Sequence, residues 1–303
     1  MVILGFMFNY MLRVNLTIAI TAMVGNPNTT STNVTSGLGE ENSTISSVGA
    51  VEADASSSKF HWDKYEQNLV LGSFFWGYIL TELPGGRMAE IVGARKIFGG
   101  GMLLASALTL LTPLFCYWGL IPVVLLRGVL GFFLGATWPA IPPMAAKWIP
   151  PMERSKFIAN MMASSLGAAF TMPVCGFLID RLGWASVFYL TGAVGFLWSV
   201  AWFFLVFDSP ADHPRISAAE KLEIESKIAE ATIGTKPKSV PWRAMLTSGP
   251  VWAIIVTHGC SVFGFFTIVN QLPTFIKEVL HLDVKKNGLF SSLPYLGKLN
   301  LFF

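Results

Sequence analysis

Residues 2–24, "VILGFMFNYMLRVNLTIAITAMV", form an apolar run with a single charge, Arg13, near its middle. A bilayer core of about 30 Å requires about 20 apolar residues in a helix, so this run is long enough to cross a membrane. A charge at the centre of such a helix costs roughly 2.5–3.5 kcal/mol on insertion scales, and it often marks a functional site. The stretch predicts a membrane helix with a specific role for its arginine.

The composition of the whole chain also indicates a membrane protein. Hydrophobic residues make up 53% of the 303 residues and charged residues 13%, whereas soluble domains carry roughly 25% charged residues. The net charge of +3 is small and dispersed, so nucleic acid is not expected as a partner. The three cysteines lie in apolar segments without metal-ligand spacing. We therefore expect an integral membrane protein with the lipid bilayer as its environment, and with no metal or organic cofactor.

Further segments with the length and hydropathy of membrane helices follow the first. The chain is expected to be all-α, with an amino-terminal six-helix domain over residues 1–207, a cytoplasmic linker over 208–248 and a partial second domain over 249–303. In the linker, Ser217 with Glu220 three residues later predicts a capped, solvated helix. Because the chain begins inside its first helix and the eighth segment is short, both ends are expected to be incomplete relative to a longer parent. The segments after the first are 66–86, 96–118, 120–144, 157–179, 184–207, 250–275 and a short one from Asn287.

The loops predict the orientation of the chain in the membrane. Lys and Arg are more frequent in the loops that share a side with the amino end, which places that side in the cytoplasm. The loop over residues 25–63 is rich in Asn, Ser and Thr and lies on the opposite side. It contains N-x-S/T sequons at Asn28, Asn33 and Asn42, which are glycosylated only on the lumenal or extracellular side.

Glycosylation tests this orientation. Endoglycosidase treatment of protein made in glycosylation-competent cells is expected to increase its electrophoretic mobility, and the combined substitution of Asn28, Asn33 and Asn42 by Gln is expected to remove that shift. Asn15 also begins a sequon, but it lies within the first apolar run, so Asn15→Gln serves as the matched control without effect. An untreated protein that already runs at the deglycosylated mobility would contradict the orientation.

The segment "GGRMAEIVGARK", residues 85–96, follows the second predicted helix. Its glycines permit a tight inner turn, and its acid and basic residues can form a latch at the inner gate. The pattern resembles the loop signature of the major facilitator superfamily, although Ile91 and Ala94 stand where that signature has basic residues. The residues that match the signature are Gly86, Ala89, Glu90, Gly93, Arg95 and Lys96.

Three more stretches carry a narrower resemblance. They are "LGSFFWGYILTELPGGR" at 71–87, "RGVLGFFLGATWPA" at 127–140 and "NQLPTFIKEVL" at 270–280. These blocks are similar to the anion:cation symporter family, which includes the sodium-dependent inorganic phosphate cotransporters, sialin and the vesicular glutamate transporters. The first block looks most like the insect inorganic phosphate cotransporters. The resemblance implies a major facilitator fold of twelve helices, of which this chain holds the first bundle and a fragment of the second.

Arg13 lies on a polar stripe of the first helix. Asn9, Arg13 and Thr17 recur at intervals of four residues, and Tyr10 lies beside them three residues before Arg13. A polar stripe in a membrane helix usually faces a cavity rather than lipid. The planar guanidinium suits bidentate binding of a carboxylate or phosphate, so Arg13 and Asn9 are candidate substrate-binding residues. The alternative is a structural ion pair between Arg13 and Glu82.

The resemblance adds further candidates to this site. Arg127 matches the arginine that relatives place on the same cavity from their fourth helix, and Tyr78 matches a position that hydrogen-bonds the substrate. Tyr10 and Tyr78 are therefore expected to orient an anion held by Arg13 and Arg127. The alternative for Arg127 is snorkelling of its side chain to the membrane surface. The nearby small residues predict close helix packing rather than binding, and they are Gly128, Gly131 and Gly135.

The coupling ion remains open between Na⁺ and H⁺. Glu82 and His258 are the candidate coupling residues, because a buried carboxyl and an imidazole can change protonation near neutral pH. Their alternatives are a pair with a loop arginine for Glu82 and a packing role for His258. Proton-coupled relatives carry acids three and seven residues after the helix-four arginine, whereas Leu130 and Leu134 occupy these positions here. The sequence does not choose between sodium coupling and a proton path through Glu82 or His258, and we expect uptake to depend on sodium more than on a pH gradient.

The residues and the resemblance together predict a transporter, not an enzyme. We expect a cation-coupled secondary active transporter that moves small anions by alternating access, with inorganic phosphate as the first candidate substrate and an organic carboxylate as the second. Its location is expected to be the plasma membrane or an endolysosomal or vesicular membrane. The alternative is a truncated, non-transporting membrane protein that acts by associating with full-length relatives.

Overall fold

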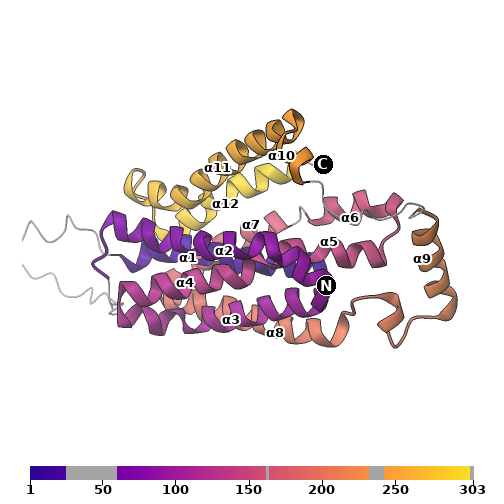
Figure 1. Cartoon of the computed structure of the whole chain (residues 1–303). Coiled ribbons are helices and arrows are strands. Elements are labelled where there is room, and N and C mark those ends of the chain that lie inside the picture. The colour runs from indigo at the N-terminus through magenta and orange to yellow at the C-terminus, as the bar shows by residue number, and fades with distance from the viewer. Residues whose placement is uncertain (25–59, 162–163, 232–241, 301–303) are drawn as a thin grey trace, which may run out of the picture.

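The computed structural model describes residues 1–24, 60–161, 164–231 and 242–300, and these fold almost entirely into helices (Figure 1). Their one β contact is an isolated bridge between Val24 and Phe60. Two short 3₁₀ turns, η2 (Pro151–Glu153) and η3 (Pro210–Asp212), interrupt the helical order. The α-helices are α1 (Val2–Met23), α2 (Lys64–Val92), α3 (Ala94–Trp118), α4 (Leu120–Gly135), α5 (Thr137–Trp148), α6 (Arg154–Met161), α7 (Ser164–Leu182), α8 (Ala185–Leu205), α9 (Ala218–Ala231), α10 (Trp242–Leu246), α11 (Gly249–Glu278) and α12 (Val284–Asn300).

Six helical stretches of the described residues are long and apolar enough to cross a bilayer. The all-α membrane architecture expected from the sequence is thus confirmed. The second predicted segment also forms a helix, α2, which packs along α4 and α5. The six stretches are Val2–Met23, Ala94–Trp118, Leu120–Trp148, Ser165–Leu182, Ala185–Leu205 and Gly249–Glu278.

One predicted segment differs from the observed helices. The predicted helix 120–144 is divided into α4 and α5 at Ala136. Pro139 has no N–H to donate to the carbonyl of Gly135 four residues earlier, which explains the interruption. Within the predicted helix 157–179, the described residues form α6 up to Met161 and α7 from Ser164, and residues 162–163 lie outside the described part of the chain.

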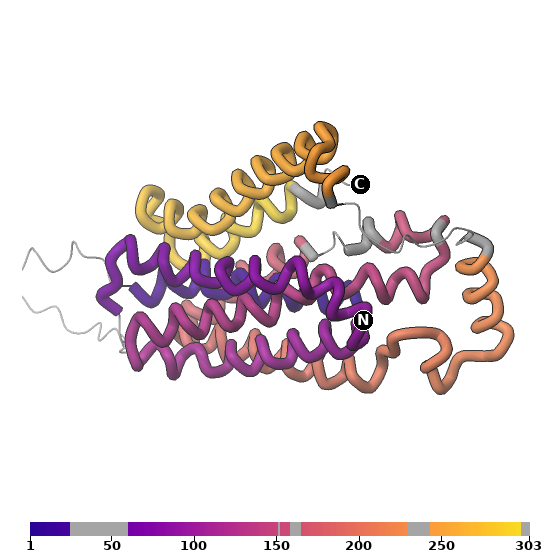
Figure 2. Tube along the Cα trace, in the orientation of Figure 1, coloured from indigo at the N-terminus to yellow at the C-terminus, as the bar shows by residue number. Residues whose placement is uncertain are grey.

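Helices α2 and α4 approach each other closely through glycines, and Figure 2 shows them running side by side. A Cβ added to Gly77 would lie 1.8 Å from the backbone oxygen of Gly128, and one added to Gly131 would lie 1.9 Å from the backbone oxygen of Phe74. Thr81 Oγ1 also donates a 2.7 Å hydrogen bond to the carbonyl of Phe132 across this interface. The packing role predicted for these glycines is confirmed.

The segment that resembles the gating-loop signature is mostly helical. Helix α2 continues to Val92, so Gly86 and Glu90 lie inside its last turns and only Gly93 forms the turn to α3. Gly93 has φ +106°, a conformation that glycine adopts without strain. Glu90 pairs with Arg87 at 2.5 Å on the same helix, and Lys96 is exposed.

Asp208, which the sequence pattern did not single out, completes this turn. Its Oδ1 accepts a 2.8 Å hydrogen bond from the backbone N–H of Arg95, in the first turn of α3. An acidic side chain at a helix amino terminus stabilises the unpaired N–H groups there. The guanidinium of Arg95 donates to the carbonyl of Phe203 in α8, so this arginine connects α3 to the end of α8.

Helices α11 and α12 lie side by side along one side of the bundle formed by the earlier helices (Figure 1). Helix α12 packs on α7, where a Cβ on Gly288 would lie 2.6 Å from the backbone oxygen of Met172. Helix α11 packs on α1 and α12, and Asn287 Nδ2 donates a 2.7 Å hydrogen bond to the carbonyl of Pro273 between them.

The linker contains the predicted capped helix. Helix α9 follows Ser217, whose Oγ accepts a 3.2 Å hydrogen bond from the backbone N–H of Glu220. This bond satisfies one of the free N–H groups at the helix start. The capping prediction is confirmed.

Candidate functional site

The guanidinium of Arg13 lies within a group of aromatic rings. Its Cζ atom is 4.2 Å from the ring centroid of Phe266 on α11 and 5.0 Å from that of Phe75 on α2. The other three ring centroids lie 5.2 to 5.8 Å away. We call this group the aromatic cage, and its members are Tyr10, Phe74, Phe75, Tyr78 and Phe266.

The local sequence explains four of the five rings. Phe74, Phe75 and Tyr78 are spaced to lie on one side of α2, and Tyr10 precedes Arg13 by three residues on α1. The negative face of an aromatic ring attracts a cation by about 0.5–2 kcal/mol, with the larger values at desolvated positions. The cage therefore stabilises a positive charge away from water without neutralising it.

Arg127 of α4 lies next to this group. Its side chain is 3% exposed, and a terminal nitrogen is 3.5 Å from the backbone oxygen of Arg13. Its Cζ is 5.3 Å from the ring centroid of Phe74, so one ring contacts both arginines. The Nε of Arg127 has no hydrogen-bond partner among the described residues. The two arginines bring concentrated positive charge into the interior of the bundle.

Neither arginine has an acidic partner in the described part of the chain. The ion pairs there are Lys64–Glu278, Arg87–Glu90, Lys221–Glu225 and Lys227–Glu223. Glu82 is exposed on α2, so the structural pair between Arg13 and Glu82 is not formed. Arg127 is buried rather than extended to a surface, which argues against the snorkelling alternative.

The residues of the predicted polar stripe on α1 have different partners in the structure. The Asn9 amide donates a 2.9 Å hydrogen bond to Thr137 Oγ1 on α5, and Asn9 is 2% exposed. Thr17 Oγ1 donates to the carbonyl of Val14 on its own helix. The structure therefore brings Arg13, Arg127, Tyr10 and Tyr78 together, and places Asn9 in a helix-packing contact.

The remaining candidates lie away from the arginines. Glu82 is exposed on α2, and His258 is exposed on α11. The sequons at Asn28, Asn33 and Asn42 lie outside the described residues. No contact places either coupling candidate beside the arginines in the described part of the chain.

Two pockets of the described residues lie away from Arg13 and its surrounding rings. One pocket of about 280 Å³ lies near Trp148 and His213, and a second of about 230 Å³ lies between α1, α7 and α8. Neither of these two pockets is lined by Arg13 or Arg127.

Sequence reasoning missed three cage residues, Phe74, Phe75 and Phe266. The pair in "GSFFWGY" carried a signal, because Phe74 precedes Tyr78 by four residues and shares its helix face. Phe266 carried no comparable signal, since it lies 253 residues after Arg13 and reaches it only through the packing of α11 on α1.

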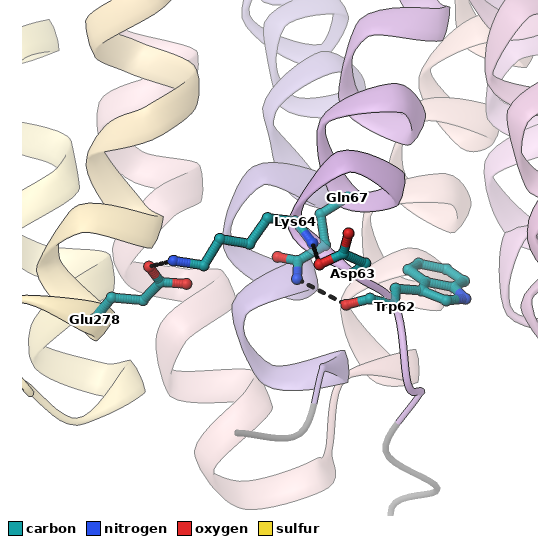
Figure 3. A network of polar contacts seen from close by, with 5 residues as sticks. All are labelled: Trp62, Asp63, Lys64, Gln67 and Glu278. Carbon is teal, nitrogen blue, oxygen red and sulfur yellow. Dashed lines mark hydrogen bonds and ion pairs between the residues drawn. The ribbon is translucent and has the colours of Figure 1, made fainter. Parts of the chain in front are cut away.

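Polar contacts join α11 to α1 and α2 at the end of the bundle where α1 ends and α2 begins. Figure 3 shows Lys64 of α2 reaching Glu278 of α11, with Nζ and Oε2 2.7 Å apart. Gln271 donates a 2.9 Å hydrogen bond to Asn68, and Lys277 donates to the backbone oxygen of Thr21. We call these three contacts the α11 latch. They hold α11 against the helices that carry Arg13 and the cage.

Repeated membrane-spanning helices around a half-buried arginine, Arg13, and a buried one, Arg127, define the class of this protein: a multi-pass integral membrane protein with a polar site inside its helical bundle. A family model described as Major Facilitator Superfamily matches residues 2–302, and the chain belongs to that family. It is thus a member of a transporter family rather than an enzyme.

Two curated relatives indicate which group of this superfamily the chain resembles. The chain is 40% identical to sialin of Homo sapiens over 294 residues, which cover 97% of this chain and 58% of sialin. It is 36% identical to vesicular glutamate transporter 2.1 of Danio rerio over 297 residues, which cover 97% of this chain and 48% of that protein. The chain spans about half the length of these relatives, and the similarity fits the anion:cation symporter group.

Proposed function

We propose that this chain carries the anion-binding site of a cation-coupled secondary transporter that works by alternating access. One observation carries the proposal: Arg13 and Arg127, on two different helices, lie together inside the bundle, and no acidic partner neutralises them among the described residues. A buried charge without a partner is costly. A bound anion would supply the missing negative charge.

The chemistry of the site suits a small oxyanion. A guanidinium presents N–H donors in a planar fork that matches two oxygens of a carboxylate or phosphate. The ring centroids of Tyr10 and Tyr78 lie 5.8 and 5.2 Å from Arg13 Cζ, and their hydroxyl groups are suited to orient the anion. Inorganic phosphate is the first proposed substrate. An organic carboxylate is the second, and the printed name of one group of relatives, vesicular glutamate transporter, supports this candidate.

We propose Na⁺ rather than H⁺ as the coupling ion. Leu130 and Leu134 follow Arg127 on α4, and both are buried in an apolar cluster with Phe74. These side chains cannot carry a proton. Glu82 and His258 remain the proposed coupling residues, and the plasma membrane or an endolysosomal or vesicular membrane is the proposed location.

Uptake into proteoliposomes tests the coupling. Accumulation of labelled phosphate or glutamate is expected to require an inward sodium gradient, and an imposed pH gradient alone is expected to give little uptake. Proton-driven uptake in sodium-free medium would contradict sodium coupling, and Glu82→Gln would then be the next variant to measure. Anion binding without uptake would support the alternative in which the chain acts by association with longer relatives.

A further inference from the structure

We propose that Phe266 of α11 is a positioning residue for the anion site, whose ring holds the Arg13 guanidinium in place for the anion. This inference rests on the proposed function, because it takes Arg13 as an anion ligand. Phe266 has the ring centroid nearest to Arg13 Cζ, at 4.2 Å. It is also the one cage member that comes from a helix other than α1 and α2.

The ring of Phe266 is itself held by other rings. It packs edge-to-face against Phe75 of α2, with centroids 5.8 Å apart and planes at 63°. It also contacts Phe265, and Phe265 contacts Tyr295 of α12, with ring centroids 6.0 Å apart and planes at 90°. Edge-to-face contacts of this kind favour a defined ring orientation. The position of Phe266 against Arg13 is therefore set by α2, α11 and α12 together.

The α11 latch lies farther along the same helix. Gln271, which contacts Asn68 of α2, is five residues after Phe266, and Glu278, which pairs with Lys64, lies at the helix end. Gln271 lies on the same side of Pro273 as Phe266, so its contact with Asn68 holds the part of α11 that carries the ring, whereas Pro273 lies between Phe266 and Glu278. Seating of α11 by the latch thus brings the Phe266 ring onto Arg13, and movement of α11 away would open the cage.

An aromatic ring suits this position better than an acid would. A cation–π contact uses the face of the ring and takes up no N–H group, whereas a carboxylate at the same place would accept hydrogen bonds from the guanidinium and neutralise it. The Phe266 ring limits the conformational freedom of the Arg13 side chain and leaves the positive charge of the guanidinium available to an anion. Because the ring belongs to α11, the anion affinity of Arg13 depends on where α11 lies.

The test compares two substitutions of Phe266 in the purified full chain. Equilibrium binding of labelled phosphate, with glutamate as a second probe, is expected to be about 5- to 30-fold weaker in Phe266→Leu, which loses the ring but keeps apolar volume. Phe266→Tyr keeps the ring and is expected to bind within about twofold of the wild type. Phe263→Leu is the matched control: Phe263 lies on the same helix, is 75% exposed and is not a member of the cage.

The outcomes separate this inference from the proposed function. If the wild type binds anion and Arg13→Lys abolishes binding while Phe266→Leu binds normally, Phe266 has no positioning role. An equal loss in Phe266→Tyr and Phe266→Leu would also overturn the inference, because the ring would not be what matters. Failure of the folded wild type to bind either probe would instead refute the proposed function. If Phe266→Leu does not elute as a monodisperse protein, Phe266→Met provides the comparison.

Discussion

Arg13→Lys is expected to remove most anion binding while the protein folds and reaches the membrane normally. Lysine keeps the positive charge but concentrates it in an ammonium group without the planar fork, so two parallel hydrogen bonds to one oxyanion are lost. The five rings of the cage also surround a flat guanidinium. The compact ammonium group of lysine presents a smaller surface to these rings and fits them less well. The loss of a charge-assisted hydrogen bond costs roughly 1.5–3 kcal/mol. That free energy corresponds to about a 10- to 150-fold increase in the dissociation constant.

The measurement is phosphate and glutamate binding to purified protein, together with uptake at matched membrane expression. Arg215→Lys is a suitable control, since Arg215 is exposed in the linker far from the cage in the sequence. Normal binding and uptake by Arg13→Lys would remove Arg13 from the substrate site. The combined variant Arg13→Leu with Glu82→Leu gives a second check, because it would retain transport only if the two residues served to neutralise each other.

Gly131→Ala is expected to destabilise the protein strongly although it adds a single methyl group. The new Cβ would lie 1.9 Å from the backbone oxygen of Phe74 and 2.8 Å from its carbonyl carbon. Backbone atoms of a helix cannot move aside as a flexible side chain can, so α2 and α4 must separate. Overpacking of this kind costs about 3 kcal/mol. Helix propensity alone predicts that Gly131→Ala would stabilise the protein, because alanine is favoured over glycine by about 1 kcal/mol in a helix interior.

Thermal unfolding of the detergent-purified protein tests this expectation. Gly72→Ala is the matched control on α2, because a Cβ there has no neighbouring atom within 4 Å. The unfolding temperature is expected to fall for Gly131→Ala and to stay level or rise for Gly72→Ala. Equal stability of the two variants would mean that α2 and α4 are not packed as closely as the structure has them. Separation of these helices would also move Phe74 of α2 away from Arg127 of α4, so weaker anion binding is expected to accompany the loss of stability.

Much of the helical framework was predictable from hydropathy because membrane insertion depends on a local property, the apolar content of about 20 successive residues. The first segment, 2–24, agrees with α1 to within a residue of its end, and Ser217 caps α9 as its spacing with Glu220 predicted. The clearest difference arose at the fourth predicted segment, where Pro139 interrupts the helical hydrogen bonds inside an apolar stretch.

The sequence by itself determined that the chain crosses the membrane repeatedly, where its arginines enter the bundle, and which family it belongs to. Length, polarity and motif spacing are properties of short stretches. Only the tertiary structure decided which side chains meet around Arg13. Asn9, four residues from Arg13 and expected beside it, turns to Thr137, whereas Phe266, 253 residues away, lies nearest to the guanidinium. Such contacts depend on how α1, α5 and α11 pack against one another, and neighbours along one helix carry no information about that packing.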